Sequence, residues 1–375
     1  MSSSRRLLLA AFLTDASLYL VFAALPFRAM ELGAGPVRLG ILPTLYAAAY
    51  TLSANLGGRV SDRIPRLTLA RGGAAVFLLG AVALAQTPST AWMFLVLPVL
   101  GIGLGWFWSP VMAAVADRAE PGRLTGAVAR FNIAWSLGKG GGLVLGGWLT
   151  ETLEPRTAMM AAAAPVLLTV LVLPRERRGP VAAPAEPTPE PAAPRAPEPP
   201  VFLPLAWITN ALAFGTASTL NMHAPRFLLD RGGGPSAFGL LLGSVFIVQT
   251  ATFLVTARRR PGRSTLFAAY GLVLAGLAVF LLTAGSPVRL VAALPLGVGF
   301  GLAYATSIHA SLDRPAGRGR AAGWHESLLG AGSSTLPLLG GALIAVAGGT
   351  VYPFLLAGGL LAAGLVVSRA RLRRA

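Results

Sequence analysis

Apolar segments of about twenty residues recur along nearly the whole chain, and they limit which folds it can adopt. As helices, such segments are long enough to cross a hydrocarbon core of about 30 Å. Apolar residues make up 54% of the 375 residues. A water-soluble domain of this length could not bury so much apolar surface. We therefore predict an all-α polytopic membrane protein surrounded by a lipid bilayer.

Charged residues, prolines and glycines divide the sequence into twelve predicted membrane-spanning helices. These are expected at residues 7–28, 37–57, 67–86, 91–116, 124–149, 156–173, 202–227, 236–257, 264–284, 287–311, 321–347 and 350–368. The first apolar run is interrupted by Thr14 and Asp15 and precedes no soluble domain. We therefore expect a retained helix rather than a cleaved signal peptide.

Arginines gather in alternate connections between the predicted spans. Those expected on the opposite side of the membrane are only Arg28, Arg38, Arg156, Arg226, Arg231 and Arg289. This asymmetry is typical of the positive-inside rule and predicts that both termini are cytoplasmic. We expect the cell (inner) membrane as the location.

A proline-rich stretch separates the sixth span from the seventh. Residues 174–200 contain closely spaced prolines and no large apolar cluster, which favours an extended cytoplasmic linker. The predicted organisation is an N-terminal six-helix bundle at 1–173, the linker at 174–200, and a C-terminal six-helix bundle with a basic cytoplasmic tail at 201–375.

The two halves repeat each other. Four pairs of segments match in order at separations of 194 to 199 residues: 97–118 with 294–314, 132–149 with 326–343, 11–16 with 206–211, and 33–40 with 232–239. Six spans repeated with both termini on one side predict two bundles related by an axis along the membrane normal.

With this repeat in view, the stretch GGRVSDRIPR at 57–66 resembles the loop between helices two and three of major facilitator superfamily transporters. The matching residues that we expect to form a cytoplasmic gate motif are Gly58, Asp62, Arg63 and Arg66. Pro65 replaces the family's second glycine. The resemblance implies that this loop helps to latch the outward-open form, although a role in fixing orientation alone would also explain its charges.

Few ionisable residues lie deep within the predicted spans. They are Asp15 in the first, Lys139 in the fifth, and His325 and Glu326 in the eleventh. A charge at the bilayer centre costs about 2.5–3.5 kcal/mol on insertion scales, so each needs a partner or a function. We predict that Asp15 and Glu326 are reversibly protonated and that Lys139 is a substrate or counter-ion residue. The alternative is an internal ion pair that only fixes packing.

The repeat adds further candidates for the same site. Asn210 aligns with Asp15, and Asn132 aligns with Glu326. Trp108 and Tyr304 would offer aromatic surface on the fourth and tenth spans, which line the cavity in the family that this chain resembles. We expect Asn132, Asn210, Trp108 and Tyr304 to contact substrate or counter-ions, with helix packing as the alternative for the aromatic residues.

Glycines cluster in the fifth span and in its repeat. The run GGLVLGG at 141–147 resembles the family's antiporter motif, except that Leu143 replaces the proline. We expect close helix packing at Gly142, Gly146, Gly147, Gly340 and Gly341, because small residues allow backbones to approach.

Other classes of protein lack support in the sequence. The absence of cysteine excludes disulfides and thiolate metal sites, and we expect no metal and no cofactor. The net charge of +17 lies in short clusters rather than in a basic stripe, which argues against nucleic acid as a partner. No nucleotide-phosphate loop, zinc motif or nucleophile triad is present, so we predict no enzyme activity.

The predicted function is secondary transport of a small organic solute by alternating access, coupled to protons, with export by antiport favoured. Proton symport for uptake and an uncoupled facilitator remain alternatives. A non-transporting membrane receptor on the same scaffold is an alternative of another class. We expect the protein to act as a monomer.

Overall fold

The computed structural model describes residues 3–61, 63–119, 124–174, 198–256, 261–283, 285, 287–312 and 318–375, and these residues form helices and no strands. The first half contains α1 (Ser3–Glu31), α2 (Pro36–Val60), α3 (Arg66–Ala85), α4 (Thr90–Asp117), α5 (Leu124–Thr152), α6 (Pro155–Ala161) and α7 (Ala163–Val172). The second half contains α8 (Phe202–Leu229), α9 (Pro235–Thr256), α10 (Arg263–Thr283), the 3-10 helix η1 (Pro287–Ala292), α11 (Ala293–Leu312), α12 (Arg318–Ala347) and α13 (Tyr352–Arg374). Most of the predicted linker lies outside the described residues.

The prediction of twelve spans is confirmed, with two local differences. The sixth span is divided into α6 and α7, near Pro165, which has no N–H to donate to the preceding helical turn. The tenth span begins as the 3-10 helix η1, which starts at Pro287, before it continues as α11. Neither difference changes the order or the number of crossings.

Nine spans in the described part of the chain are long and apolar enough to cross a membrane by composition alone. The other three, α2, α5 and α8, contain 25, 29 and 28 residues, so their length suffices. They are less apolar, and each packs against a helix of the opposite bundle. Polar residues in the middle of these helices, such as Ser53, Ser136 and Asn210, are buried against protein, as expected for helices between two bundles.

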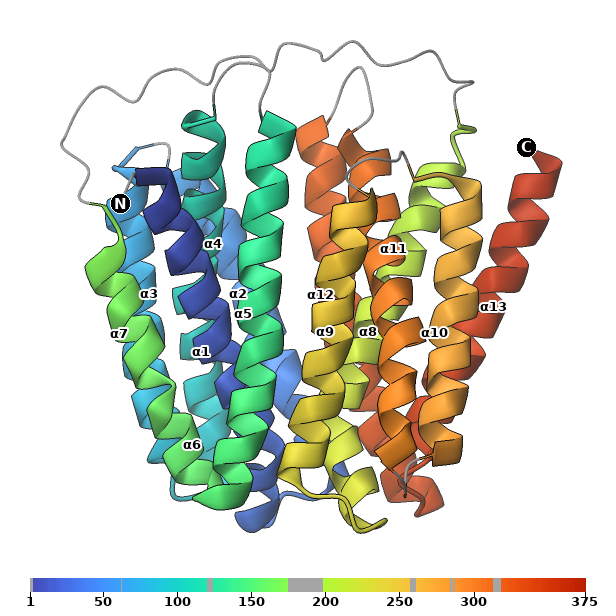
Figure 1. The fold of residues 1–375 in the computed structure, drawn as a ribbon, viewed down its shortest axis with the longest axis horizontal. Helices are drawn as coiled ribbons and strands as arrows, with labels where there is room; N and C mark the ends of the chain where they lie inside the picture. Colours follow the sequence, from blue (N-terminus) through green and yellow to red (C-terminus); the bar gives the residue numbers. More distant parts are fainter. Residues whose placement is uncertain are drawn as a thin grey trace.

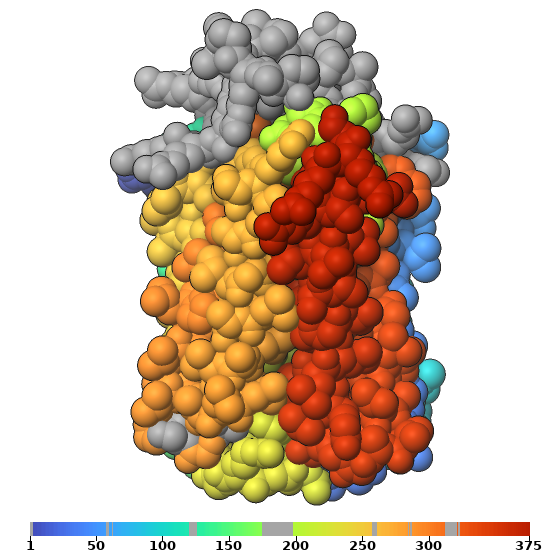
Figure 2. Space-filling view, turned by 90° about the vertical axis from the view of Figure 1, so that its right-hand side faces the viewer, coloured from blue at the N-terminus to red at the C-terminus, as the bar shows by residue number. Residues whose placement is uncertain are grey.

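Two bundles stand side by side in the molecule, α1–α7 in one and α8–α13 in the other (Figure 1). Each has its own apolar core. Figure 2 shows α10 and α13 running together over the outer face of the C-terminal bundle. Apolar side chains are exposed on both helices, among them Leu282 on α10 and Val366 on α13. Both termini lie at the same end of the molecule (Figure 1), which we call the termini end; the opposite end is the far end.

The sequence repeat reappears in how the bundles meet. The inter-bundle contacts pair α5 with α9 and α2 with α12. At the far end, Gly147 packs against Pro235 at the start of α9, and Gly341 packs against Pro36 at the start of α2. These are equivalent positions of the two halves, so a pseudo-two-fold axis relates the bundles. The prediction of two pseudo-symmetric six-helix bundles is thus confirmed.

The bundles touch at the far end and separate toward the termini end. A Cβ on Gly40 would lie 2.9 Å from the Leu338 Cα atom, so α2 and α12 are in backbone contact there. Farther along α12, a Cβ on Gly330 would still meet the Thr51 side chain, whereas a Cβ on Gly323 would have no neighbour within 4 Å among the described residues. The space between the bundles is therefore closed at the far end.

Candidate functional site

A cavity of about 240 Å³ lies between the bundles and is lined by helices from both of them. Most of its lining is apolar and aromatic. The charged residues that line it are Asp15, Lys139 and Glu326, and its polar amides and hydroxyls include Asn132, Asn221, Ser218 and Ser333. The three deep ionisable groups singled out in the sequence thus share one space.

Asp15 and Lys139 belong to the same bundle. Asp15 lies on α1 and Lys139 on α5, two helices in close contact through small residues such as Gly142, which packs against Ala16. Both side chains are buried, with 5% of each residue exposed. The two groups interact electrostatically without forming an ion pair within 4.0 Å. Their opposite charges therefore offset each other inside the N-terminal bundle.

Aromatic rings surround the Lys139 ammonium group. Its Nζ atom lies 3.8 Å from the centroid of the Phe246 ring and 4.4 Å from that of Tyr19. Phe214 lies farther away, at 5.7 Å. Attraction between a cation and a ring face stabilises a buried ammonium by roughly 0.5–2 kcal/mol. Because Phe246 and Phe214 come from the C-terminal bundle, this cage is completed only when the bundles meet.

Glu326 enters the cavity from α12, in the opposite bundle. Half of its side chain is exposed, and its Oε1 atom lies 3.8 Å from Nε2 of His325. His325 is fully buried, and its Nδ1 atom shares a 2.8 Å hydrogen bond with the Ser307 hydroxyl on α11. The ring of His325 is thereby held in place beside Glu326. Sequence reasoning placed His325 next to Glu326 but had no means of finding Ser307.

Three more predicted residues also line the cavity: Asn132, Trp108 and Tyr304. The Trp135 indole donates a 3.0 Å hydrogen bond to Oδ1, the side-chain amide oxygen of Asn132. The ring of Tyr304 packs edge-on against that of His325, with centroids 5.1 Å apart. These residues form a wall of the cavity near its termini end.

Asn210 does not line the cavity. It is completely buried within the C-terminal bundle, and neither polar atom of its side chain has a hydrogen-bond partner among the described residues. The repeat aligned Asn210 with Asp15, but the two side chains have different surroundings, since Asp15 lines the cavity and Asn210 does not. On the same helix, Asn221 lines the cavity instead.

The predicted gate motif lies at the termini end. Asp62 is outside the described residues, and Gly58 is in the last turn of α2. Arg63 is exposed, whereas Arg66 forms an ion pair with Asp117 at the end of α4. This pair joins two helices of one bundle, so in this conformation Arg66 does not bridge the bundles.

The predicted packing glycines all lie at close helix contacts. Gly142 and Gly146 pack against α1, Gly340 packs against Pro353 of α13, and Gly147 and Gly341 lie at the inter-bundle contacts described above. A Cβ at Gly147 would lie 2.8 Å from the Gly239 Cα atom, which leaves no room for a larger residue.

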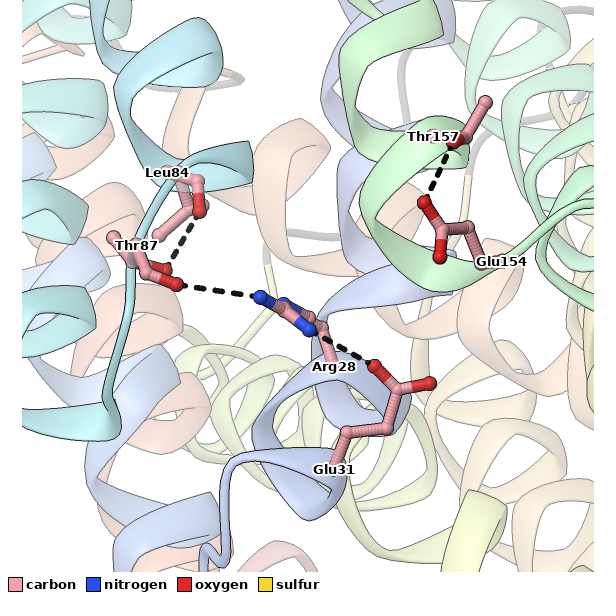
Figure 3. Close-up of polar contacts among 6 residues, drawn as sticks. All are labelled: Arg28, Glu31, Leu84, Thr87, Glu154 and Thr157. Carbon is pink, nitrogen blue, oxygen red and sulfur yellow. Dashed lines mark hydrogen bonds and ion pairs between the residues drawn. The ribbon is translucent and has the colours of Figure 1, made fainter.

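A carboxylate at the far end joins the bundles and was missed from the sequence. Glu151, in the last turn of α5, accepts a 2.6 Å hydrogen bond from the backbone N–H of Ser236 in the first turn of α9. Such a carboxylate satisfies a free N–H group at a helix N-terminus. The far-end polar contacts drawn in Figure 3 stay within one bundle: Arg28 donates to Glu31 and to the Thr87 carbonyl, and Glu154 accepts a hydrogen bond from Thr157.

Within the described residues, no group of three or more His, Asp or Glu side chains is placed to hold a metal ion. The cavity can instead bind, neutralise or exchange charge through two carboxylates and one ammonium group, with aromatic surface around them. Such groups suit binding of an organic molecule and uptake or release of protons.

Comparisons with known proteins agree with the helical architecture. The family model described as Major Facilitator Superfamily matches residues 7–316. No curated protein sequence matches the chain. The crystal structure of a mutant of the nucleoside transporter NupG is similar at 13% identity with a TM-score of 0.76, covering 98% of this chain and 99% of that one. A POT family transporter in complex with 5-aminolevulinic acid is similar at 14% identity with a TM-score of 0.77, covering 99% and 96%.

Proposed function

This chain belongs to the major facilitator superfamily, and from that premise we propose that it exports a small organic solute in exchange for protons. Transport of small molecules across a membrane is the activity of the family; the coupling ion and the direction are our proposal. The observation that carries it is the cavity between the two bundles, closed at the far end, which brings Asp15, Lys139 and Glu326 together.

We propose that the termini end faces the cytoplasm. Arginines gather in the connections at this end, and the positive-inside rule then assigns its side. In this orientation the structure is an inward-facing state, in which solute enters from the cytoplasm. Rocking of the bundles about the cavity would open the far end and release the solute outside.

The carboxylates supply the proposed coupling. Glu326 is half exposed to the cavity, so a proton and a solute can both reach it. Asp15 is buried beside Lys139. A solute that enters the space around the Lys139 ammonium group would therefore change how readily Asp15 takes up a proton. Exchange requires that solute and proton compete, and a shared carboxylate makes them compete.

Inside-out vesicles with an acidified lumen test the proposal. A set of solutes is added outside, and a lumenal pH dye reports proton release. If the protein exports by antiport, the lumenal pH rises when a substrate enters, whereas symport lowers the lumenal pH. An uncoupled facilitator moves labelled solute into the lumen without changing its pH. A receptor binds the solute but does not move it across the membrane.

Variants connect that result to the cavity. We expect Glu326→Gln and Asp15→Asn to abolish or strongly reduce substrate-dependent pH change, whereas Glu154→Gln, a far-end carboxylate within one bundle, retains it. Full pH-driven transport in both cavity variants would show that these carboxylates do not carry the protons.

A further inference from the structure

The charge that a solute meets first in this cavity is negative. Half of the Glu326 side chain is exposed, whereas Asp15 and Lys139 have 5% of their surface exposed. Glu326 forms no hydrogen bond with any described residue, and its Oε1 atom lies 3.8 Å from Nε2 of His325. Its carboxylate is therefore available to an incoming ligand.

The positive charge of Lys139 is already compensated. Two ring faces, from Phe246 at 3.8 Å and Tyr19 at 4.4 Å, cover its ammonium group. Asp15 in the same bundle offsets its charge. An anionic solute would have to displace these rings and compete with Asp15, so Lys139 is a poor docking point for a free acid.

The walls around Glu326 suit a cation with an apolar body. Tyr50, Trp108, Trp135 and Tyr304 line the cavity together with several phenylalanines. Aromatic rings attract organic cations through their electron-rich faces, and they attract anions poorly. A half-exposed carboxylate with aromatic walls therefore selects by charge as well as by shape.

We propose that the cavity binds organic cations that carry an aromatic or other apolar group, with the Glu326 carboxylate as their counter-ion. This inference deepens the proposed transport function and rests on it. It also explains how exchange would occur, because a bound cation and a proton neutralise the same carboxylate and exclude each other.

Protons should weaken binding of the cation at low pH. The groups that face Glu326 are Tyr50 from α2, Tyr304 from α11 and its neighbour His325 on α12. Asp15 and Lys139 lie across the same cavity as a mutually compensated pair. The tyrosines are neutral near pH 7, which leaves Glu326 as the exposed group whose charge a proton would remove.

Two small, permanently charged probes of similar shape test the inference. Phenyltrimethylammonium and benzenesulfonate each carry a tetrahedral charged group on a benzene ring, with opposite signs. Their binding to the full chain is measured by titration calorimetry in nanodiscs of phosphatidylcholine, which has no net charge. We expect the wild-type chain to bind the cation at least about tenfold more tightly than the anion, and more tightly at pH 8 than at pH 5.

Variants at Glu326 give the decisive comparison. We expect Glu326→Gln to bring the two probes within about threefold of each other and Glu326→Lys to reverse the preference, an outcome that misfolding could not produce. Glu154→Gln removes the same charge outside the cavity and should behave as wild type. Equal or tighter binding of benzenesulfonate to wild type, or an unchanged preference in Glu326→Gln, would overturn the inference.

The outcome is separable from that of the transport proposal. Preference for the cation without any coupled movement in vesicles would refute proton exchange and leave the binding class standing. Glu326-dependent, pH-driven transport in a chain that prefers benzenesulfonate would refute the binding class and leave exchange standing.

Discussion

Removing the Glu151 carboxylate should shift the chain toward a conformation that is open at the far end. In the structure, this carboxylate from α5 accepts a 2.6 Å hydrogen bond from the Ser236 N–H of α9, across the bundle interface. Opening of the far end must break that bond. Glu151→Ala therefore destabilises the closed state and leaves the open state almost unchanged.

The size of the shift follows from the kind of bond that is lost. A hydrogen bond to a charged group contributes about 1.5–3 kcal/mol, and exposure to water at the helix end reduces this to about 1–2 kcal/mol. The ratio of closed to open molecules should then fall by about five- to thirtyfold. A ratio of about 100 in the wild type would become roughly 3–20, so an open population becomes detectable.

Double electron–electron resonance can measure this population, because the chain has no cysteine and any introduced pair is unique. Leu153→Cys and Val346→Cys place spin labels on exposed far-end positions of the two bundles. We expect Glu151→Ala to add a longer-distance component to the distribution. Glu154→Ala is the matched control, since Glu154 bonds Thr157 of its own bundle (Figure 3). Identical distributions for Glu151→Ala and Glu154→Ala would refute the argument that Glu151 holds the far end closed.

Three other perturbations test the remaining parts of the site. Gly341→Val should prevent closure at the far end, because an added Cβ meets the first turn of α2. The control Gly358→Val should leave closure unchanged, because a Cβ there has nothing within 4 Å among the described residues. The same spin-label pair measures the effect of both variants. Lys139→Met should lower the melting temperature, because it removes the cation beside buried Asp15 and reduces the free energy of unfolding by about 1–3 kcal/mol. Adding Asp15→Asn should restore part of the lost stability, and an equal loss in the double variant would contradict this. In vesicles, Glu326→Gln should flatten the dependence of transport on pH, and an unchanged pH profile would exclude Glu326 as the coupling residue.

The number of spans, their approximate positions and their pseudo-symmetry were predictable from the sequence, although some helix ends differ, such as that of α13, which continues to Arg374 instead of ending at 368. Apolar length and charged boundaries mark each helix, since lipid leaves the backbone no alternative to helical hydrogen bonding. The repeat also predicted which segments occupy equivalent places, and the matching contacts of Gly147 and Gly341 confirm this at atomic detail.

The side-chain environment of the site was only partly predictable. Asp15, Lys139 and Glu326 share one cavity as expected, because ionisable groups avoid lipid. Asn210 shows the limit, since its alignment with Asp15 could not reveal that its helix turns it into the bundle core. Alignment of the repeats predicts the depth of a residue in the membrane, but it does not predict which face of the helix turns toward the cavity and which toward the core.

Contacts between the bundles lie beyond sequence reasoning for a different reason. Tyr19 follows Asp15 by one helical turn and could have been assigned to the same face. Phe246 is more than a hundred residues from Lys139 in sequence, and only the docking of α9 on α5 brings its ring over the ammonium group. The Glu151 contact with Ser236 depends on the same docking.

The division of the cavity between bundles has a mechanical consequence. Asp15 and Lys139 move together, because both are carried by the N-terminal bundle, whereas Phe246 and Glu326 move with the other. Any rocking that separates α9 from this part of α5 removes a ring from the Lys139 ammonium group and exposes it to water or to solute. Phe246 thus stabilises that ammonium group in one conformation and not in the other, so this contact contributes to the free-energy difference between the two conformations. A ligand can shift the equilibrium only through such differential interactions, and a cation held at Glu326 would repel Lys139 as the bundles close around it. The same geometry that shields the lysine in this state therefore links the charge in the cavity to the position of the bundles.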